Sequence, residues 1–264
     1  MAKTWLIVKE ECFPLATTIF EGSITKESKQ HLGAAIGSEE FKQAYVREKV
    51  ATWVQGVDQL TTVAETQPHA AYAAFTHGLA SKWTFLTRIV PDTGDLFQPL
   101  EDAIQQCFLP TLTGQSAFND NVRNLIALPS RLGGLGIINP ARQVDTQHQT
   151  SHEVTTPLVR HIIEQSKDFP LEAQEEQIQA KHAACQAKRQ AQISEANNIQ
   201  ATLPSSLQKA VEIAKETGAS TWLTALPITE HGFSFHKGAF RDALCLQYGW
   251  RPHYYHCNVY VIRA

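Results

Sequence analysis

The chain has 264 residues, of which 43% are hydrophobic and 19% are charged. This composition excludes wholesale disorder, and the length can supply one good hydrophobic core or two smaller ones. The formal net charge of -3 at pH 7 excludes a strong overall attraction to nucleic acid or to an anionic membrane, so any contact with a polyanion must be local.

Cysteine usage and hydropathy indicate the compartment. The five cysteines are an odd number, lie far apart and include no Cys-x-x-Cys pair, which favours reduced thiols over a disulfide framework. The apolar run at residues 5–8 is too short for a signal peptide, and no later run is long enough to span a bilayer. We therefore expect an intracellular protein, nuclear or cytoplasmic, that is neither secreted nor inserted in a membrane.

Two short extended segments are predicted near the N-terminus. Residues 5–8 are apolar and partly β-branched, and residues 31–37 are bounded by glycine. We expect the two segments to pair as a small antiparallel sheet. Because two strands alone are marginal in water, this sheet needs a partner that the chain does not obviously contain.

Helical signals begin at Ser38, a predicted N-cap. Apolar residues then recur at three- and four-residue spacing, which predicts a long amphipathic helix over residues 38–64. Prolines mark the limits of the next two helices, predicted over residues 68–90 and 99–108, and Pro110 is expected to stop the second of these.

Three further capping signals follow. The Asn-Asp pair at residues 119–120 is expected to cap a fourth helix. The Asn-Pro pair at 139–140 combines an N-cap with a proline at the first helical position, and the Thr-Pro pair at 156–157 repeats this signal. The middle of the chain is therefore predicted to be all helical, with a new helix beginning at each pair.

The densest glycine stretch is residues 128–140, Leu-Pro-Ser-Arg-Leu-Gly-Gly-Leu-Gly-Ile-Ile-Asn-Pro. Gly133, Gly134 and Gly136 allow positive φ and the close approach of another segment, while the apolar neighbours anchor the turn. Their spacing fits neither the dinucleotide fingerprint nor the P-loop, and no lysine follows. We expect a packed structural turn between helices and not a nucleotide loop.

The last third of the chain differs in composition. Residues 171–199 are rich in Gln, Ala, Glu and Lys and lack the second apolar core position of a coiled coil, which indicates an exposed connecting helix. Its basic cluster at 181–189 is interpreted either as a phosphate contact or, more commonly for such runs, as a solvated face. Pro204 then opens another helix, and a short final helix is predicted with Phe240 and Leu244 facing inward.

No residue pattern predicts catalysis. The chain has no Asp-Asp or Asp-x-Asp element for magnesium and no Gly-x-Ser-x-Gly elbow, so no catalytic residue and no metal ligand is assigned. His253, His256 and Cys257, together with Cys245, are of the types that bind zinc. Their spacing matches no standard zinc pattern, and an exposed terminus is the alternative interpretation.

Basic residues near aromatic side chains are the better candidates for a binding role. They lie at predicted helix ends or in the glycine turn, near Trp83 and Phe85, a combination suited to gripping a nucleic-acid backbone. For each of them, solvated surface or charge compensation at a helix C-terminus is the alternative. These candidates are Lys49, Lys82, Arg88, Arg123 and Arg131.

Two sequence blocks are distinctive: Leu-Pro-x-Arg-x-Gly-Gly-Leu-Gly at residues 128–136 and His-Lys-Gly-x-Phe-Arg-Asp-Ala-Leu at residues 236–244. Five further features accompany them: Lys3-Thr4, His31-Leu32-Gly33, the helix with Trp53 and Leu60, the stretch 67–72 and the stretch 222–250. Together they resemble the C-terminal portion of a reverse transcriptase from non-LTR-type retroelements of animal genomes. The similarity covers nearly the whole chain.

The resemblance implies a mainly α chain with four parts. In such polymerases the order is fingers, palm, thumb and then a linker to a nuclease region. The four expected parts are a small antiparallel β remnant of the palm at 1–37, a thumb-like helical bundle at 38–165 that includes the turn 128–140, an exposed connecting helix at 166–200, and a truncated helical segment at 201–264.

Some residue roles also follow from the resemblance. Lys3 matches the lysine of the last palm motif, and Leu32 and Gly33 match the hairpin that grips the primer. The catalytic aspartates of the family lie upstream of Lys3 and are not in this chain. Relatives continue past the Tyr-Gly-Trp block, here residues 248–250, into a cysteine and histidine cluster and a nuclease, so we expect a truncated or frame-shifted end.

The expected function is that of a non-catalytic fragment of an RNA-directed DNA polymerase whose thumb region contacts an RNA or DNA template–primer duplex. By itself this chain is expected to be no enzyme and to hold no cofactor, because magnesium is expected only for the complete polymerase. The missing palm and fingers of the parent protein are the other expected partner, and no membrane is expected. The alternative is a helical binding or scaffold protein without a nucleic-acid role, which the acidic pI of about 6.4 favours.

Overall fold

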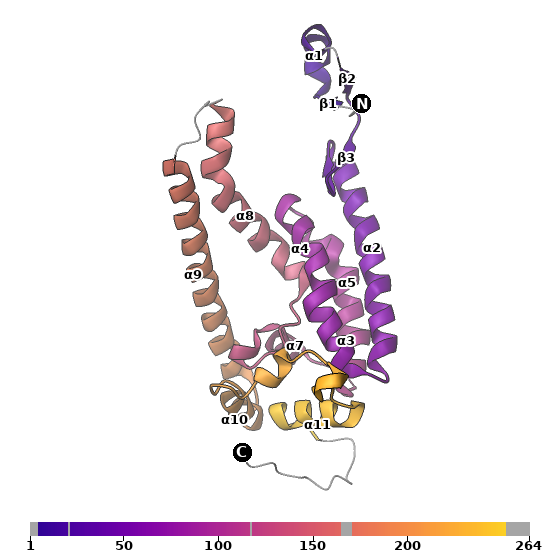
Figure 1. The fold of residues 1–264 in the computed structure, drawn as a ribbon, viewed down its shortest axis with the longest axis vertical. Helices are drawn as coiled ribbons and strands as arrows, with labels where there is room; N and C mark the ends of the chain where they lie inside the picture. The colour runs from indigo at the N-terminus through magenta and orange to yellow at the C-terminus, as the bar shows by residue number, and fades with distance from the viewer. Residues whose placement is uncertain (1–4, 21, 117, 165–170, 252–264) are drawn as a thin grey trace.

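The computed structural model describes residues 5–20, 22–116, 118–164 and 171–251. The expected mainly α fold is confirmed, and two small pairs of strands lie near the N-terminus (Figure 1). The elements of the first half are β1 (Trp5–Ile7), α1 (Phe13–Ile19), β2 (Ser23–Thr25), β3 (Lys29–His31), β4 (Ala34–Ile36), α2 (Glu39–Ala64), α3 (Pro68–Ala74) and α4 (Ala80–Ile89). Those of the second half are α5 (Gln98–Ala103), α6 (Leu109–Thr113), α7 (Asp120–Ala127), α8 (Pro140–Ile163), α9 (Leu171–Thr202), α10 (Ser205–Ala214) and α11 (Lys237–Tyr248).

The strands pair differently from the prediction. β1 and β2 pair in parallel, and α1 forms the crossover between them, as parallel neighbours require. β3 and β4 form a separate antiparallel hairpin around Leu32 and Gly33, which both have positive φ. The expected pairing of residues 5–8 with residues 31–37 is therefore wrong, because the second segment reverses direction within itself and cannot act as one strand.

The long helix α2 begins where its capping signal predicts. The Ser38 hydroxyl accepts a hydrogen bond from the amide of Phe41, which satisfies one of the free amides at the helix start. Its buried face carries apolar residues at helical spacing, and α3 and α5 pack along it. The buried residues of this face include Val46, Val50, Trp53 and Val57.

Two π-turns extend the helices that pack on α2. η2 (Phe75–Leu79) joins α3 to α4, and η4 (Ile104–Phe108) joins α5 to α6. The prediction that Pro110 stops a helix is wrong, because this proline lies in the first turn of α6 and the helix ends at the left-handed Gly114. The amide of Leu109 bonds to the carbonyl of Ile104 across the π-turn, so the hydrogen-bond register shifts just before the proline. The missing amide of Pro110 then falls at a helix start, where proline is tolerated.

The helix α8 begins as predicted but does not break as predicted. The Asn139 side chain caps it by accepting from the amide of Arg142 at 3.1 Å. Pro157 lies inside the helix, so the expected new start at 156–157 is wrong. The hydroxyl of Thr156 donates to the carbonyl of His152 at 2.7 Å, a local bond that accompanies the proline, and α9 packs along α8.

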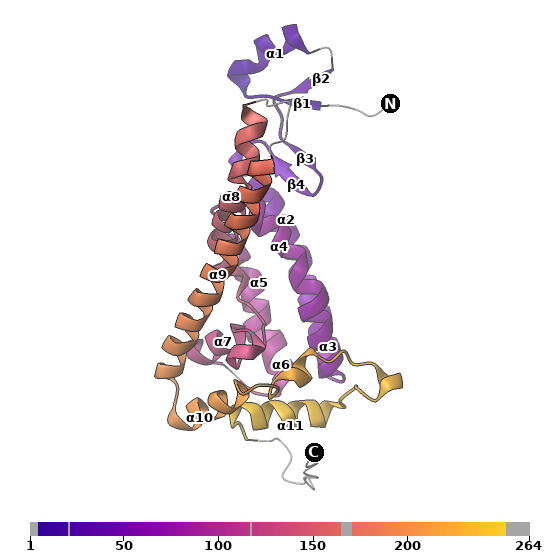
Figure 2. The ribbon, with the colours of Figure 1, turned by 60° about the vertical axis from the view of Figure 1, so that its left-hand side comes forward.

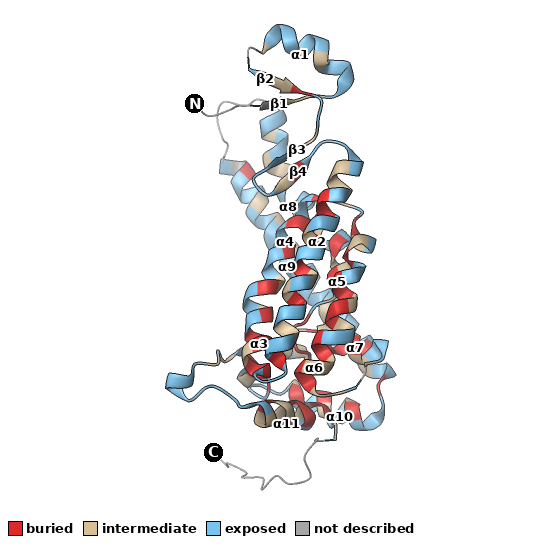
Figure 3. Cartoon of the chain, turned by 90° about the vertical axis from the view of Figure 1, so that its right-hand side faces the viewer, coloured by how far each residue is buried: buried red, intermediate tan, exposed pale blue. Residues whose placement is uncertain are grey.

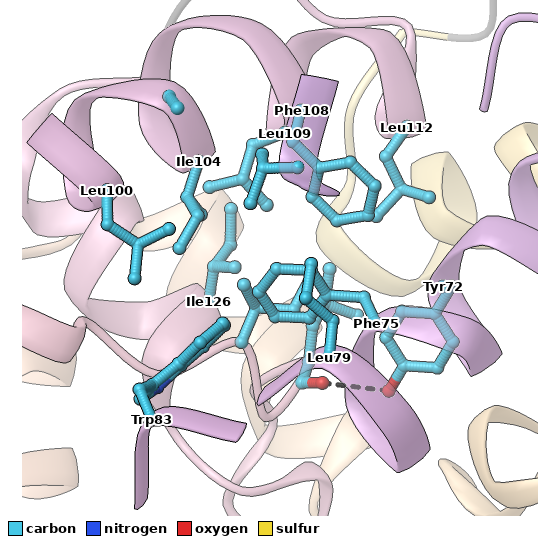
Figure 4. Close-up of a cluster of buried hydrophobic side chains, with 14 of the residues drawn as sticks. Tyr72, Phe75, Leu79, Trp83, Leu100, Ile104, Phe108, Leu109, Leu112 and Ile126 are labelled. Carbon is cyan, nitrogen blue, oxygen red and sulfur yellow. Dashed lines mark hydrogen bonds between the residues drawn. The ribbon is translucent and has the colours of Figure 1, made fainter. Parts of the chain in front are cut away.

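One hydrophobic core joins α2 to the elements up to α11. Buried residues concentrate within the helical bundle, whereas α1, β1 and β2 carry few of them (Figure 3). At its centre the rings of Phe75 and Phe108 stack with centroids 4.9 Å apart, and Trp83 meets Phe75 edge-on (Figure 4). Ring pairs of this kind add to the stabilisation from apolar burial.

The C-terminal helices close one end of the bundle. α10 and α11 lie at the end of the molecule opposite α1, β1 and β2, and α9 runs back alongside α8 (Figures 1 and 2). Phe240 and Leu244 of α11 are fully buried against the bundle, as predicted. Over the part of the chain that the structure describes, no helix is both long enough and apolar enough to cross a bilayer.

Candidate nucleic-acid interface

The β3–β4 hairpin is fastened to α2 and touches α4. The hydroxyl of Tyr45, on α2, donates to the carbonyl of Gly33 at 3.0 Å and accepts from the side-chain amide of Gln30 at 3.1 Å. On the other side of the turn, a Cβ placed on Gly33 would lie 3.5 Å from the ring of Phe85 on α4. The turn is therefore held between two helices, and Leu32 projects from it into solvent.

Three of the predicted basic residues lie on the two helices that hold this turn. The ammonium of Lys49, one helical turn after Tyr45, lies 5.1 Å from the centroid of the tyrosine ring, and it also lies 3.9 Å from the carboxylate of Glu48. Lys82 and Arg88 are exposed on α4. Within the described residues neither of these two cations forms an ion pair with a carboxylate.

Five of the eight predicted binding residues therefore lie on the hairpin or on the two helices that hold it, although they lie far apart in sequence. We call this region the hairpin–α4 surface; it consists of Leu32, Gly33, Tyr45, Lys49, Lys82, Phe85, Arg88 and Ile89. Tyr45 was not among the predicted site residues, and the signal that could have identified it is the four-residue spacing that places Lys49 over its ring. Lys3 lies outside the described residues.

Arg123 does not belong to this surface. Its guanidinium makes a bidentate ion pair with Glu101, with nitrogen–oxygen distances of 2.6 and 2.7 Å, and it also donates to the carbonyl of Ile137 at 2.8 Å. The residue is 2% exposed, so its predicted role in binding nucleic acid is corrected to a structural one. Burial raises the pKa of the Glu101 carboxyl, and the Arg123 guanidinium opposes that rise.

Arg131 lies in the glycine turn, next to α9, and not on the hairpin, α2 or α4. It is exposed, and its guanidinium donates to the side chain of Gln192 on α9 at 2.6 Å. This bond ties α9 to the turn that precedes α8. Arg131 and the hairpin–α4 surface therefore do not form one site.

The glycine turn itself is tightly packed. A Cβ on Gly134 would lie 1.9 Å from the carbonyl oxygen of Leu128, and Gly133 and Gly136 have positive φ. The hydroxyl of Tyr72 donates to the carbonyl of Leu135 at 2.8 Å, the dashed bond in Figure 4. The backbone of the turn therefore packs on itself at Gly134 and is bonded to α3 at Leu135.

Cys245 is the one residue of the predicted zinc ligands that the structure describes. Cys245 is buried, and its thiol lies 3.7 Å from the side-chain amide of Gln115 and from the carbonyl of Arg251. Burial raises the pKa of this thiol, which favours the protonated form over a metal-binding thiolate. In the ranges that the structure describes, no three His, Cys, Asp or Glu side chains gather as metal ligands, and His253, His256 and Cys257 lie outside those ranges.

Comparison with known proteins gives no relative: no family model, no curated protein and no solved structure matches this chain. The class of this protein is therefore described from its fold and its surface alone. It is a mainly helical protein with a pinned β-hairpin, and the hairpin and the two helices that hold it carry cations and exposed apolar side chains.

Proposed function

We propose that this chain is a non-catalytic nucleic-acid-binding module, the thumb and adjoining segments of an RNA-directed DNA polymerase of the non-LTR retroelement type. The observation that carries the proposal is the hairpin–α4 surface. There, the two helices that hold the hairpin carry Lys49, Lys82 and Arg88, and the hairpin and α4 expose apolar side chains, although the chain as a whole is acidic.

The arrangement suits a polyanion for two reasons. Lys82 and Arg88 have no carboxylate partner among the described side chains, so a phosphate would not have to displace one. Lys49 is held over an aromatic ring, which limits its freedom and lowers the entropic cost of binding. Local cations of this kind can bind phosphates even when the net charge is negative.

The proposal is tested by measuring how binding depends on salt. Fluorescence anisotropy of a labelled RNA–DNA duplex is followed between about 50 and 200 mM salt with the wild-type chain and with the triple variant Lys49→Gln/Lys82→Gln/Arg88→Gln. The variant should bind more weakly, and its plot of log affinity against log salt should be flatter by about 0.9 for each phosphate that it no longer neutralises.

A matched control removes the same amount of charge elsewhere. The triple variant Lys181→Gln/Lys188→Gln/Arg189→Gln changes three exposed cations of α9 and should keep the wild-type slope. Equal losses in both triple variants would contradict a local interface. Primer extension with magnesium and nucleotides should yield no product, because the sequence supplies no Asp-Asp or Asp-x-Asp element, and synthesis by the chain alone would overturn the non-catalytic assignment.

A helical scaffold function is the second candidate, and one observation favours it. The end of the α8–α9 pair carries a row of exposed apolar side chains, a feature typical of protein contact surfaces. These residues are Val159, Ile162, Ile163 and Leu171. If the labelled duplex shows no anisotropy change with the wild-type chain at low salt, the scaffold function replaces the nucleic-acid-binding function.

A further inference from the structure

The centre of the hairpin–α4 surface is apolar and exposed, and this feature is separate from its charges. Leu32 is 85% exposed at the tip of the hairpin, and Phe85 is 49% exposed on α4. Ile89, one turn further along α4, is also exposed. Cations alone would be sufficient to bind a phosphate backbone, so the ring and its apolar neighbours call for a ligand that also offers a flat apolar face.

The position of the Phe85 ring is fixed by its surroundings. Trp83 and Leu86, its neighbours on α4, are buried in the core, so the helix cannot rotate about its axis without disrupting that core. Beside the ring, Gly33 is pinned through its carbonyl by Tyr45. A ring on a fixed helix loses little conformational freedom when it stacks on a ligand.

Gly33 lies beside the Phe85 ring. Its φ of 82° is in the left-handed region that favours glycine, and a Cβ there would already be in van der Waals contact with the ring of Phe85. The turn therefore combines a conformation that favours glycine with a location where an added side chain would meet the Phe85 ring.

We propose that Phe85 stacks on an unpaired base, so that the preferred ligand of the hairpin–α4 surface is single-stranded nucleic acid or an unpaired strand end. This inference rests on the proposed function and narrows its ligand class. In a fully paired duplex the faces of internal bases are covered by their neighbours, whereas unpaired bases leave theirs free for an aromatic side chain. Lys82 and Arg88 lie about 9 Å apart along the axis of α4, from the 1.5 Å rise per residue, so they can contact phosphates on either side of the stacked base.

The experiment compares ligands and variants in one binding assay. Fluorescence anisotropy of the full chain is measured with oligouridine, with oligothymidine, and with a duplex whose ends are closed by tight loops. Phe85→Leu keeps an apolar side chain but removes the aromatic face, and Phe85→Tyr restores that face. Phe233→Leu is the matched control, because Phe233 is exposed to a similar extent, at 57%, but lies near the other end of the chain.

Phe85→Leu should weaken binding of both single strands about tenfold and leave the closed duplex unaffected, since stacking acts per unpaired base. Phe85→Tyr should restore the wild-type affinity, and Phe233→Leu should not change it. The salt slope should stay the same in all three variants because none of them removes a charge. Equal binding of oligouridine and oligothymidine would show recognition through base faces, and a preference for oligouridine would add a contact to the ribose hydroxyl; both outcomes support the proposal.

Two outcomes would overturn the inference while leaving the proposed function standing: wild-type affinity of Phe85→Leu for single strands, or an equal loss with the closed duplex. Failure of the wild-type chain to bind any of the three ligands at low salt would overturn both. Self-association in sedimentation velocity that disappears in Phe85→Leu would assign the exposed ring to a protein contact and also overturn the inference. Unchanged thermal unfolding of Phe85→Leu, expected for a half-exposed residue, confirms that the variant is folded.

Discussion

At the residue scale, the buried side chain of His69 links α3 to the C-terminal segment. The ring of His69, in the first turn of α3, is buried against the segment before α11. Its Nδ1 accepts a hydrogen bond from the amide of Phe235 at 3.2 Å, and its Nε2 lies 3.1 Å from the carbonyl of Ala225. Because Nδ1 accepts a hydrogen bond, Nε2 must carry the proton and the ring must be neutral. The ring also stacks on Phe240, so one neutral histidine joins α3 to two parts of the C-terminal segment.

The neutral state of His69 predicts a pH dependence of stability. Burial lowers the pKa of this imidazole, and the bond to Ala225 opposes the shift. The unfolded chain takes up a proton below about pH 6.5 while the folded chain does not, so the free energy of unfolding should fall as the pH drops below about 6.5 and level off below the folded pKa.

Urea unfolding at a series of pH values measures this effect. The fall should be smaller in His69→Gln, which cannot titrate. It should be unchanged in His77→Gln, a control at an exposed position of the same helical segment. The same pH dependence in all three proteins would contradict the assignment to His69.

The buried Arg123–Glu101 pair predicts the behaviour of a double variant. Arg123→Met should lower the free energy of unfolding by about 3 to 5 kcal/mol, because it leaves the Glu101 carboxylate buried without its partner. Adding Glu101→Leu should recover a large part of that loss, since it removes the unpaired charge. Chemical denaturation of the two single variants and the double variant measures both effects, and simple addition of the two losses would contradict this account of the pair.

At the element scale, the glycine turn and η2 contain two glycines without positive φ whose surroundings differ. Gly134 lies against the carbonyl of Leu128, whereas a Cβ on Gly78 in η2 would meet nothing within 4 Å. The two glycines therefore make a matched pair. Gly134 allows the backbone of the turn to approach Leu128 closely, whereas Gly78 only weakens its helix.

Alanine at these two positions should act in opposite directions. Gly134→Ala should lower the free energy of unfolding by about 2 to 3 kcal/mol, because the added Cβ forces the turn apart. Gly78→Ala should raise it by up to about 1 kcal/mol through helix propensity. Thermal or chemical unfolding distinguishes them, and a destabilised Gly78→Ala would show that η2 needs glycine for a reason other than its backbone.

At the scale of the whole molecule, stability is distributed unevenly. The bundle from α2 to α11 shares one core, whereas the described residues of β1, α1 and β2 contribute no member to it. A two-stranded sheet with one crossover helix is marginal by itself in water. This unit should therefore open without unfolding the rest of the chain.

Hydrogen exchange tests this division. The amide of Val8, which bonds to the carbonyl of Thr25, should exchange at a low opening free energy, while the amides of Val50 and Val57 on α2 should exchange only on global unfolding. Equal protection in both regions would contradict this division.

The sequence by itself determined the helical class and many helix starts. Ser38, Asn119 and Asn139 each cap the helix that their position predicts, because capping and apolar spacing depend on residues within one or two turns of each other. Only the tertiary structure decided which strand pairs with β1, how the helices pass Pro110 and Pro157, and that Arg123 is a buried partner of Glu101. It also decided that the hairpin with Leu32 lies between the helix of Lys49 and the helix of Phe85. These outcomes depend on which distant segments pack together, and no local pattern encodes that choice.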